Sequence, residues 1–279
     1  MTERLFILGA GRAGLGLARA LRAVGVEVIG VHGRREGMEG VTWGALPTAA
    51  SEAGVILVTV RDAQIDEALR ELASAPLAVG AVILHASGSA EPLALGALRR
   101  LGHPSGTFHP LVPLSDPARA PAMLRGAWIG IDGDEAARAA ARTLAGLLGA
   151  HTLEIPAGEK ARYHAAAVIA SNFPAVMLSA AERVLVAAGI APDEAAAAIR
   201  PLFMAAADNL RHQSGAASLT GPIVRGDAIT VRAHLAALAG DAGALAIYRA
   251  LSRAALPLAR EAGTDPRALA DIGRALGDG

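Results

Sequence analysis

The amino-acid sequence predicts an α/β fold, in which an N-terminal domain of Rossmann type with a parallel sheet is followed by an all-α C-terminal domain. In the first half, short apolar segments typical of buried strands alternate with segments of helical spacing. A glycine-rich turn follows the first of these strands at once. From Ala157 onward the strand signals disappear, and an Ala- and Leu-rich helical pattern takes over. We therefore expect a domain boundary near residue 156, dividing residues 1–156 from residues 157–279.

The first half predicts strands and helices in the order of βαβ units. An apolar strand from residue 5 leads into a helix over 15–24 and a second strand over 26–31. Further elements are expected as strands over 54–60, 81–85, 106–109, 127–131 and 152–155, with helices over 63–73 and 135–148. Helices of the second half are expected to break where Gly, Pro and Ser cluster, at 189–192, 214–215 and 263–266. This order favours a parallel sheet covered by helices on both faces.

The turn after the first strand carries the spacing G-x-G-x-x-G at Gly9, Gly11 and Gly14. In dinucleotide-binding units the first glycine permits the tight turn, and the second lets the backbone approach the pyrophosphate. The third lets the helix pack closely on its strand. Arg12 and Ala13 lie between these glycines, and the positive end of the dipole of the following helix faces the phosphates. We expect these residues to bind a dinucleotide, with a plain glycine turn as the alternative.

The residues after the second strand distinguish NAD from NADP. An NAD enzyme usually has an acidic residue there for the ribose 2′-hydroxyl, whereas the 2′-phosphate of NADP needs cations. This chain has His32, Gly33, Arg34 and Arg35 instead. Two guanidinium groups suit bidentate contact with a phosphate, so we expect NADP(H) as the cofactor. The alternatives are that both arginines are simply solvated, or that Glu36 turns inward.

The composition excludes several classes of function. The 279 residues contain no cysteine, which excludes disulfides, thiolate metal sites and a cysteine nucleophile. Lys plus Arg equals Asp plus Glu at 26 each, so no broad basic face for nucleic acid is expected. The histidines show no metal-ligand spacing, and no uninterrupted apolar run reaches the ~20 residues of a spanning helix. We expect a cytoplasmic protein with no metal, nucleic-acid or membrane partner.

Polar residues follow three of the predicted strands. Ligands of open α/β sheets bind beyond the carboxyl ends of the strands, so Val60, Ser87 and His109 are expected to border one crevice. We expect Val60 and Ser87 to contact the cofactor and His109 to contact the substrate. A helix cap at Ser87 and a structural hydrogen bond at His109 are the alternatives.

The start of the helical half carries a polar stripe on an otherwise apolar helix. At 100° per residue, His164 lies about 40° and Ser171 about 20° from Lys160 around the axis, so these three share one face. Asn172 lies at the edge of that face, and Pro174 is expected to kink the helix beside it. We expect a substrate site against the nicotinamide. A satisfied network between helices is the alternative.

A turn-rich segment near residue 220 offers two further candidates. Asp227 is expected to cap the following helix. Arg225 is a candidate clamp for a substrate carboxylate, and Thr220 adds a hydroxyl donor. A salt bridge between Arg225 and Asp227 is the alternative.

Taken together, these features resemble a known superfamily of Rossmann domains followed by helical domains. It includes 6-phosphogluconate and 3-hydroxyacid dehydrogenases, ketopantoate reductase and pyrroline-5-carboxylate reductase. The chain resembles most closely the Rossmann-like family with a DUF2520 C-terminal domain. The motifs that carry this resemblance are Tyr163–Ala167, Ala170–Asn172 and Leu219–Asp227.

The resemblance implies a role for two positions of the polar stripe. In the superfamily, a lysine acts as acid/base and an asparagine holds the substrate; the matching positions here are His164 and Asn172. Histidine in place of lysine still permits proton donation, because an imidazole titrates near neutrality. Lys160, one turn earlier, is the reserve candidate, and Ser171 is expected to help Asn172 position the substrate.

The residues and the resemblance together predict an NADPH-dependent reductase. A small 2-oxo acid of the ketopantoate type is the first candidate substrate, and a cyclic imine acid of the pyrroline-5-carboxylate type is the alternative. A protein that senses NADPH without turnover is the alternative from another class. The resemblance also implies a homodimer through the helical half.

Overall fold

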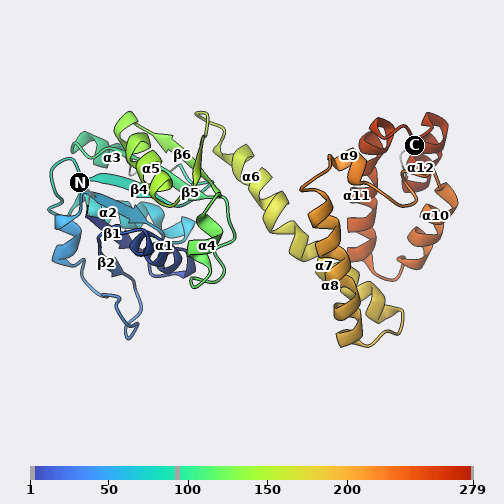
Figure 1. Cartoon of the computed structure of the whole chain (residues 1–279), viewed down its shortest axis with the longest axis horizontal. Coiled ribbons are helices and arrows are strands. Elements are labelled where there is room, and N and C mark those ends of the chain that lie inside the picture. The colour runs from blue at the N-terminus through green and yellow to red at the C-terminus, as the bar shows by residue number, and fades with distance from the viewer. Residues whose placement is uncertain (1–3, 92–94, 278–279) are drawn as a thin grey trace. The chain divides into compact units, whose positions relative to one another are not determined.

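The computed structural model describes residues 4–91 and 95–277 (Figure 1). Their contacts divide the chain into two compact units that meet at Ser171 and Asn172, later than the boundary expected at residue 156. The first unit contains a seven-stranded sheet in the order β2-β1-β3-β4-β5-β6-β7. Its strands are β1 (Leu5–Leu8), β2 (Val28–His32), β3 (Val55–Val58), β4 (Val82–His85), β5 (Ser105–Pro110), β6 (Trp128–Gly133) and β7 (His151–Glu154). All seven predicted strands are therefore present.

The sheet is mostly parallel, as predicted, with one antiparallel pair of strands. The strands from β2 to β5 pair in parallel, but β6 runs antiparallel to β5, and β7 runs parallel to β6. The route of the chain explains the reversal. Residues 111–127 leave and rejoin the sheet at the same end. This is shown by the Leu111 amide, which donates to the Trp128 carbonyl at 2.8 Å. Strand β6 thus starts where β5 ends.

Alternation along the strands builds one core on each face of the sheet. Leu5 and Ile7 of β1 pack in one cluster, whereas Phe6 and Leu8 pack in the other. The first cluster includes side chains of α1 (Arg12–Ala23), α4 (Ala120–Leu124) and α5 (Glu135–Leu147). The second includes side chains of α2 (Ile65–Ala73), α3 (Leu95–Arg100) and the short helix η1 (Thr48–Glu52). Another short helix, η2 (Asp62–Gln64), directly precedes α2 and has no buried residue. The expected helical cover of both faces is confirmed.

The second unit is all-helical, as predicted. Its helices are α7 (Phe173–Ala187), α8 (Pro192–Asn209), α9 (Gly215–Ser218), α10 (Ala228–Ala237), α11 (Ala242–Glu261) and α12 (Pro266–Leu276). The expected breaks are present between α7 and α8, before α9, and between α11 and α12. Asp227 caps α10 as predicted, because its carboxylate accepts the Thr230 amide at 3.0 Å.

Helix α6 (Lys160–Ser171) belongs to the first unit and continues almost directly into α7. The expected disturbance near Pro174 is present as a break at Asn172, with Pro174 in the first turn of α7. Together α6 and α7 form one stretch, Lys160–Ala187, long and apolar enough to cross a membrane by length and composition alone. Core helices of soluble proteins meet the same criterion, so one such stretch is weak evidence. The cytoplasmic location stays a prediction.

The turn between β1 and α1 lies at the point where the strand order reverses, because β2 and β3 lie on opposite sides of β1. Gly9 has φ of +129°, which other residues rarely adopt. A Cβ at Gly14 would collide with the Gly9 carbonyl oxygen, and a Cβ at Gly9 would lie 2.6 Å from Thr59. The Thr59 hydroxyl donates to the Gly9 carbonyl at 2.8 Å. The first and third glycines are thus required by packing alone.

We predict that Gly14→Ala lowers the free energy of unfolding by about 1–3 kcal/mol, as overpacking of a tight core does. The matched variant is Gly11→Ala, because no heavy atom lies within 4 Å of a Cβ at that position. Its loss is expected to stay below about 1 kcal/mol. Urea unfolding of both variants measures the difference. Equal losses at the two positions would contradict this account of the turn.

Candidate active site

The residues predicted at the ends of the strands do lie along one edge of the sheet. Gly9 follows β1, Val60 lies two residues after β3, Ser87 two residues after β4, and His109 is near the end of β5. These strands are all parallel, so their carboxyl ends form a single edge. The structure therefore brings the glycine turn and His109 to the same side of the first unit.

The glycine turn fits a pyrophosphate. Helix α1 starts at Arg12 immediately after Gly11, so the amide groups of its first turn have no partners within the helix. Arg12 is exposed and Ala13 is half-buried. A Cβ at Gly11 would meet no heavy atom within 4 Å, so space is open above this backbone. Free amides, an open approach and the helix dipole together suit an anion.

The two arginines after β2 are accessible to a ligand. Both Arg34 and Arg35 are exposed. The Arg34 guanidinium lies 2.5 Å from a carboxylate oxygen of Glu67 on α2, which is also exposed. An exposed ion pair contributes little to stability, so a phosphate can compete with Glu67 for Arg34. Two exposed arginines at this position are compatible with NADP(H), and the preference for NADP(H) stays a prediction.

Val60 and Ser87 have local roles in the structure. Val60 packs against the buried cluster beneath the sheet edge. The Ser87 hydroxyl oxygen accepts the Ala90 amide at 3.0 Å and the Ser89 amide at 3.3 Å, so it holds the turn after β4. The Ser89 hydroxyl in turn donates to Asp62 at 2.9 Å. Contact of Val60 and Ser87 with a cofactor stays a prediction.

Two histidines converge on the turn after β4. A Cβ at Gly88 would lie 2.7 Å from His164 Nδ1 and 2.8 Å from His109 Nε2. The two rings meet edge to face, with centroids 5.8 Å apart. Tyr163 also joins the group, because its hydroxyl lies 2.7 Å from His109 Nδ1. His164 Nδ1 is buried and has no hydrogen-bond partner among the described residues. We call His109, Tyr163 and His164 around Gly88 the histidine cluster.

Burial keeps two members of the histidine cluster neutral at pH 7. Desolvation, followed by the nearby His164, lowers the pKa of His109 to about 4. Desolvation raises the pKa of the Tyr163 phenol above its ordinary value. His109 is therefore a neutral imidazole and Tyr163 a neutral phenol. The cluster can offer hydrogen-bond donors to a ligand without carrying a full charge on these two groups.

Lys160 is buried, with only 3% of its surface exposed. Its ammonium group lies 2.7 Å from the Thr107 hydroxyl, 2.9 Å from the Ala90 carbonyl and 3.0 Å from Asp132. His85 Nε2 follows at 3.5 Å. Burial, followed by the Lys160 charge, lowers the pKa of His85 to about 3. The ammonium group is surrounded by these three protein oxygens, which favours a structural role over proton donation.

The remaining predicted residues lie at the end of α6 and in the second unit. The Ser171 hydroxyl donates to the Ala167 carbonyl at 2.8 Å at the end of α6. Asn172 is exposed and belongs to the second unit. Thr220 and Arg225 are exposed residues of that unit, in the loop before α10. Their contact with a substrate stays a prediction.

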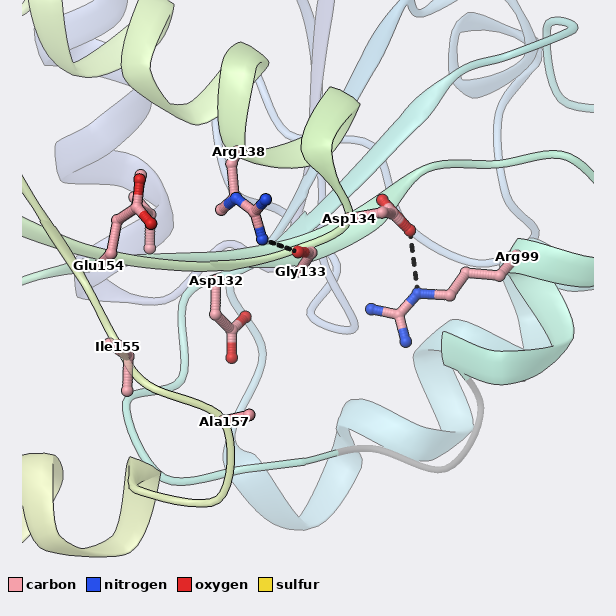
Figure 2. A pocket seen from close by; sticks show the side chains of 9 residues that line it. Arg99, Asp132, Gly133, Asp134, Arg138, Glu154, Ile155 and Ala157 are labelled. Carbon is pink, nitrogen blue, oxygen red and sulfur yellow. Dashed lines mark hydrogen bonds and ion pairs between the residues drawn. The ribbon is translucent and has the colours of Figure 1, made fainter.

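A separate cavity of about 480 Å³ lies over the turn after β6 (Figure 2). Its charged side chains are largely paired with one another or with backbone. Arg99 donates to Asp134 at 3.0 Å, and Arg138 donates to the Gly133 carbonyl at 2.7 Å. Asp132 on its wall is the partner of Lys160. Because its charges are engaged in this way, the histidine cluster is the stronger candidate for chemistry.

Sequence reasoning did not assign roles to Thr59, Gly88 or Tyr163. Thr59 directly follows β3, so its place at the sheet edge was a usable signal. Gly88 lies in a glycine- and serine-rich turn, where a missing side chain gives no cue about its neighbours. Tyr163 precedes His164, but its contact with His109 spans 54 residues of sequence. Only the folded chain shows that contact.

We predict that Lys160→Met lowers the free energy of unfolding by about 3–5 kcal/mol, because it leaves the Asp132 charge without its buried partner. The double variant Lys160→Met, Asp132→Asn is expected to recover part of that loss, since no charge is then stranded. Urea unfolding of the two variants and of Asp132→Asn measures the coupling. A near-zero loss for Lys160→Met would show that Lys160 is not the buried anchor described above.

Comparisons with known proteins agree with the fold. Residues 127–255 match the family model "Domain of unknown function (DUF2520)". The structure of BF3122 from Bacteroides fragilis, described as a "putative NADP oxidoreductase", is 21% identical with a TM-score of 0.73, covering 91% of this chain and 98% of that one. TM1727 from Thermotoga maritima is 25% identical with a TM-score of 0.70, and the match covers 92% of this chain and 98% of that one.

A third similar structure is the pyrroline carboxylate reductase of Plasmodium falciparum with NADP bound. It is 10% identical with a TM-score of 0.58, covering 99% of this chain and 97% of that one. No curated protein matches the sequence. The resemblance expected from the sequence is confirmed at the level of domain and fold. The chain has a Rossmann-like fold, and its residues 127–255 are similar to the DUF2520 family.

Proposed function

We propose that this protein is an NADPH-dependent reductase of a small carbonyl or imine acid. The observation that carries the proposal is the convergence of His109 and His164 on Gly88, on the sheet edge that also bears the open glycine turn. Reduction of a C=O or C=N bond leaves negative charge on oxygen or nitrogen, so it needs a proton donor beside the reacting carbon. Paired imidazoles meet that need.

The residues of the first unit divide between cofactor and substrate. Gly9, Gly11 and Gly14 with the first turn of α1 would hold the pyrophosphate, and Arg34 with Arg35 would hold the 2′-phosphate. NADPH supplies a hydride when it is bound. His164 donates the proton to the developing oxyanion or amine, and His109 adds a hydrogen bond to the same atom.

The substrate class rests on the resemblance and on the comparisons. A 2-oxo acid of the ketopantoate type is the first candidate from the spacing of His164 and Asn172. The solved pyrroline carboxylate reductase, which shares the fold, favours a cyclic imine acid as the second. Either acid carries a carboxylate, for which Arg225 with Thr220 remains the proposed clamp, and Ser171 with Asn172 would position the reacting group. A protein that binds NADPH without turnover is the alternative class.

We also propose that the helical unit pairs with a second copy. Among its described residues, a small buried cluster has Ala228, Val231, Ile272 and Leu276 at its centre. Large apolar side chains of this unit stand exposed instead. They include Phe173, Val176, Leu202, Met204 and Ile229. Association would remove this apolar surface from water.

We predict that Arg34→Gln weakens NADPH binding about tenfold and leaves NADH binding unchanged, because only NADPH carries the 2′-phosphate. The matched variant Glu67→Gln removes the competing carboxylate, so NADPH binding is expected to hold or tighten. Fluorescence titration of both nucleotides measures the two dissociation constants. Equal losses for NADPH and NADH in Arg34→Gln would contradict the assignment of the 2′-phosphate site.

We predict NADPH oxidation with ketopantoate or with pyrroline-5-carboxylate, and a fall of kcat on the order of a hundredfold in His164→Gln with NADPH affinity unchanged. His151→Gln, an exposed histidine on β7, is the control and should keep wild-type activity. Absorbance at the NADPH band follows the reaction. Tight NADPH binding without turnover of either acid would reject both substrates and favour the sensing alternative.

A further inference from the structure

Tyr163 contacts His109, although the proposed reduction assigns no role to the phenol. Its hydroxyl lies 2.7 Å from His109 Nδ1, and the two rings meet edge on at 80° with centroids 5.5 Å apart. The phenol reaches this position only because residue 130 is glycine. A Cβ on Gly130 in β6 would collide with the Tyr163 hydroxyl. Strand β6 thus provides a slot for the phenol, and the phenol faces one nitrogen of His109.

We propose that the Tyr163 hydroxyl donates a hydrogen bond to His109 Nδ1 and thereby holds His109 as the tautomer with its N–H on Nε2. His109 then acts as a hydrogen-bond donor beside Gly88, and proton transfer is left to His164. This inference deepens the proposed function and rests on it for the role of His109 in turnover. Tyr163 itself is a positioning residue, because it acts through His109.

The protonation states of both partners support this direction of the hydrogen bond. Burial and the neighbouring His164 lower the pKa of His109, and burial raises the pKa of Tyr163, so both are neutral near pH 7. Between a neutral phenol and a neutral imidazole, the phenol O–H is the stronger acid and the unprotonated ring nitrogen the stronger base. The hydroxyl therefore donates and Nδ1 accepts.

The charges around His109 do not reverse this arrangement. His164 and Lys160 on α6 both disfavour a positive charge on the ring, whereas Asp62 in η2 favours one. Burial outweighs each of them, because it is the largest cause of the shift. His109 stays neutral and carries a single N–H group. The tautomer alone then decides whether that group points toward Tyr163 or toward Gly88.

The consequence is a fixed donor on the ligand side. With Nδ1 accepting from Tyr163, the only N–H of His109 is on Nε2, which lies 2.8 Å from the position that a Cβ of Gly88 would take. His164 Nδ1 lies 2.7 Å from that same position. A substrate oxygen or nitrogen held near this point would accept a hydrogen bond from His109, which strengthens as negative charge develops.

The chain offers a matched control for this contact. In the second unit, the hydroxyl of Tyr248 lies 2.9 Å from His234 Nδ1, with ring centroids 5.6 Å apart at 85°. The pair has the same chemistry and nearly the same geometry. Neither residue belongs to the proposed catalytic machinery. Tyr248→Phe therefore removes an equivalent hydroxyl without touching the histidine cluster.

The first test is nuclear magnetic resonance of the histidine rings in the full-length protein without ligand at pH 7. Imidazole ¹⁵N spectra distinguish the two tautomers, and His109→Asn identifies the His109 signals. We expect the Nε2–H form of His109 in the wild type and a mixture of tautomers in Tyr163→Phe. Tyr248→Phe should change the His234 signals and leave those of His109 unchanged. A proton on Nδ1 of His109 in the wild type, or an unchanged spectrum in Tyr163→Phe, would overturn the proposal.

The second test is turnover of NADPH with ketopantoate and with pyrroline-5-carboxylate. Tyr163→Phe is expected to lower kcat on the order of a hundredfold, with the NADPH dissociation constant within about twofold of wild type. Tyr248→Phe should keep wild-type kcat. Unchanged kcat in Tyr163→Phe would overturn the role of the pair in catalysis. If the wild type turns over neither acid, the proposed function fails, whereas the ring spectra still decide the tautomer.

Discussion

The candidate site depends on one buried cation, the ammonium group of Lys160. It connects the first turn of α6 to three neighbouring strands or their ends, through Thr107 in β5, Asp132 in β6 and the Ala90 carbonyl after β4. A buried charge is tolerated only when its partners are held in place, so this contact fixes α6 relative to the sheet. His164 lies about one turn further along the same helix. Lys160 therefore determines where His164 meets the turn after β4.

Missing side chains are as important to this site as the ones present. Gly14 lets α1 approach the turn after β1, Gly88 leaves room for two imidazole rings, and Gly130 leaves room for the Tyr163 hydroxyl. Protein interiors are packed so tightly that even one methyl group at such points would displace its neighbours. The glycine turn and the histidine cluster thus both depend on backbone positions that carry no side chain.

The sequence was sufficient for the elements that depend on local pattern. The strands, the glycine turn, the Asp227 cap and the helix breaks depend on periodicity and on nearby residues, and all of these were predicted correctly. The antiparallel direction of β6 was not predicted, because strand direction depends on the path of the 111–127 connection rather than on apolar pattern. The helical face of Lys160 was predicted, but its burial was not. That burial depends on Asp132 and Thr107, which are distant in sequence.

Lys160 also affects the chemistry of the site through its charge. At His85, where its charge competes with that of Asp132, the effect of Lys160 on the pKa is the larger of the two. It disfavours protonation of His109 as well. The same positive charge would favour negative charge that develops on a nearby ligand atom, and a low local dielectric strengthens both effects. Burial is the main reason that the His109 imidazole is neutral, and the Lys160 charge acts in the same direction. In the proposed reaction, this charge would also stabilise a negatively charged product. That combination needs a proton donor other than Lys160 and His109, which is the role proposed for His164.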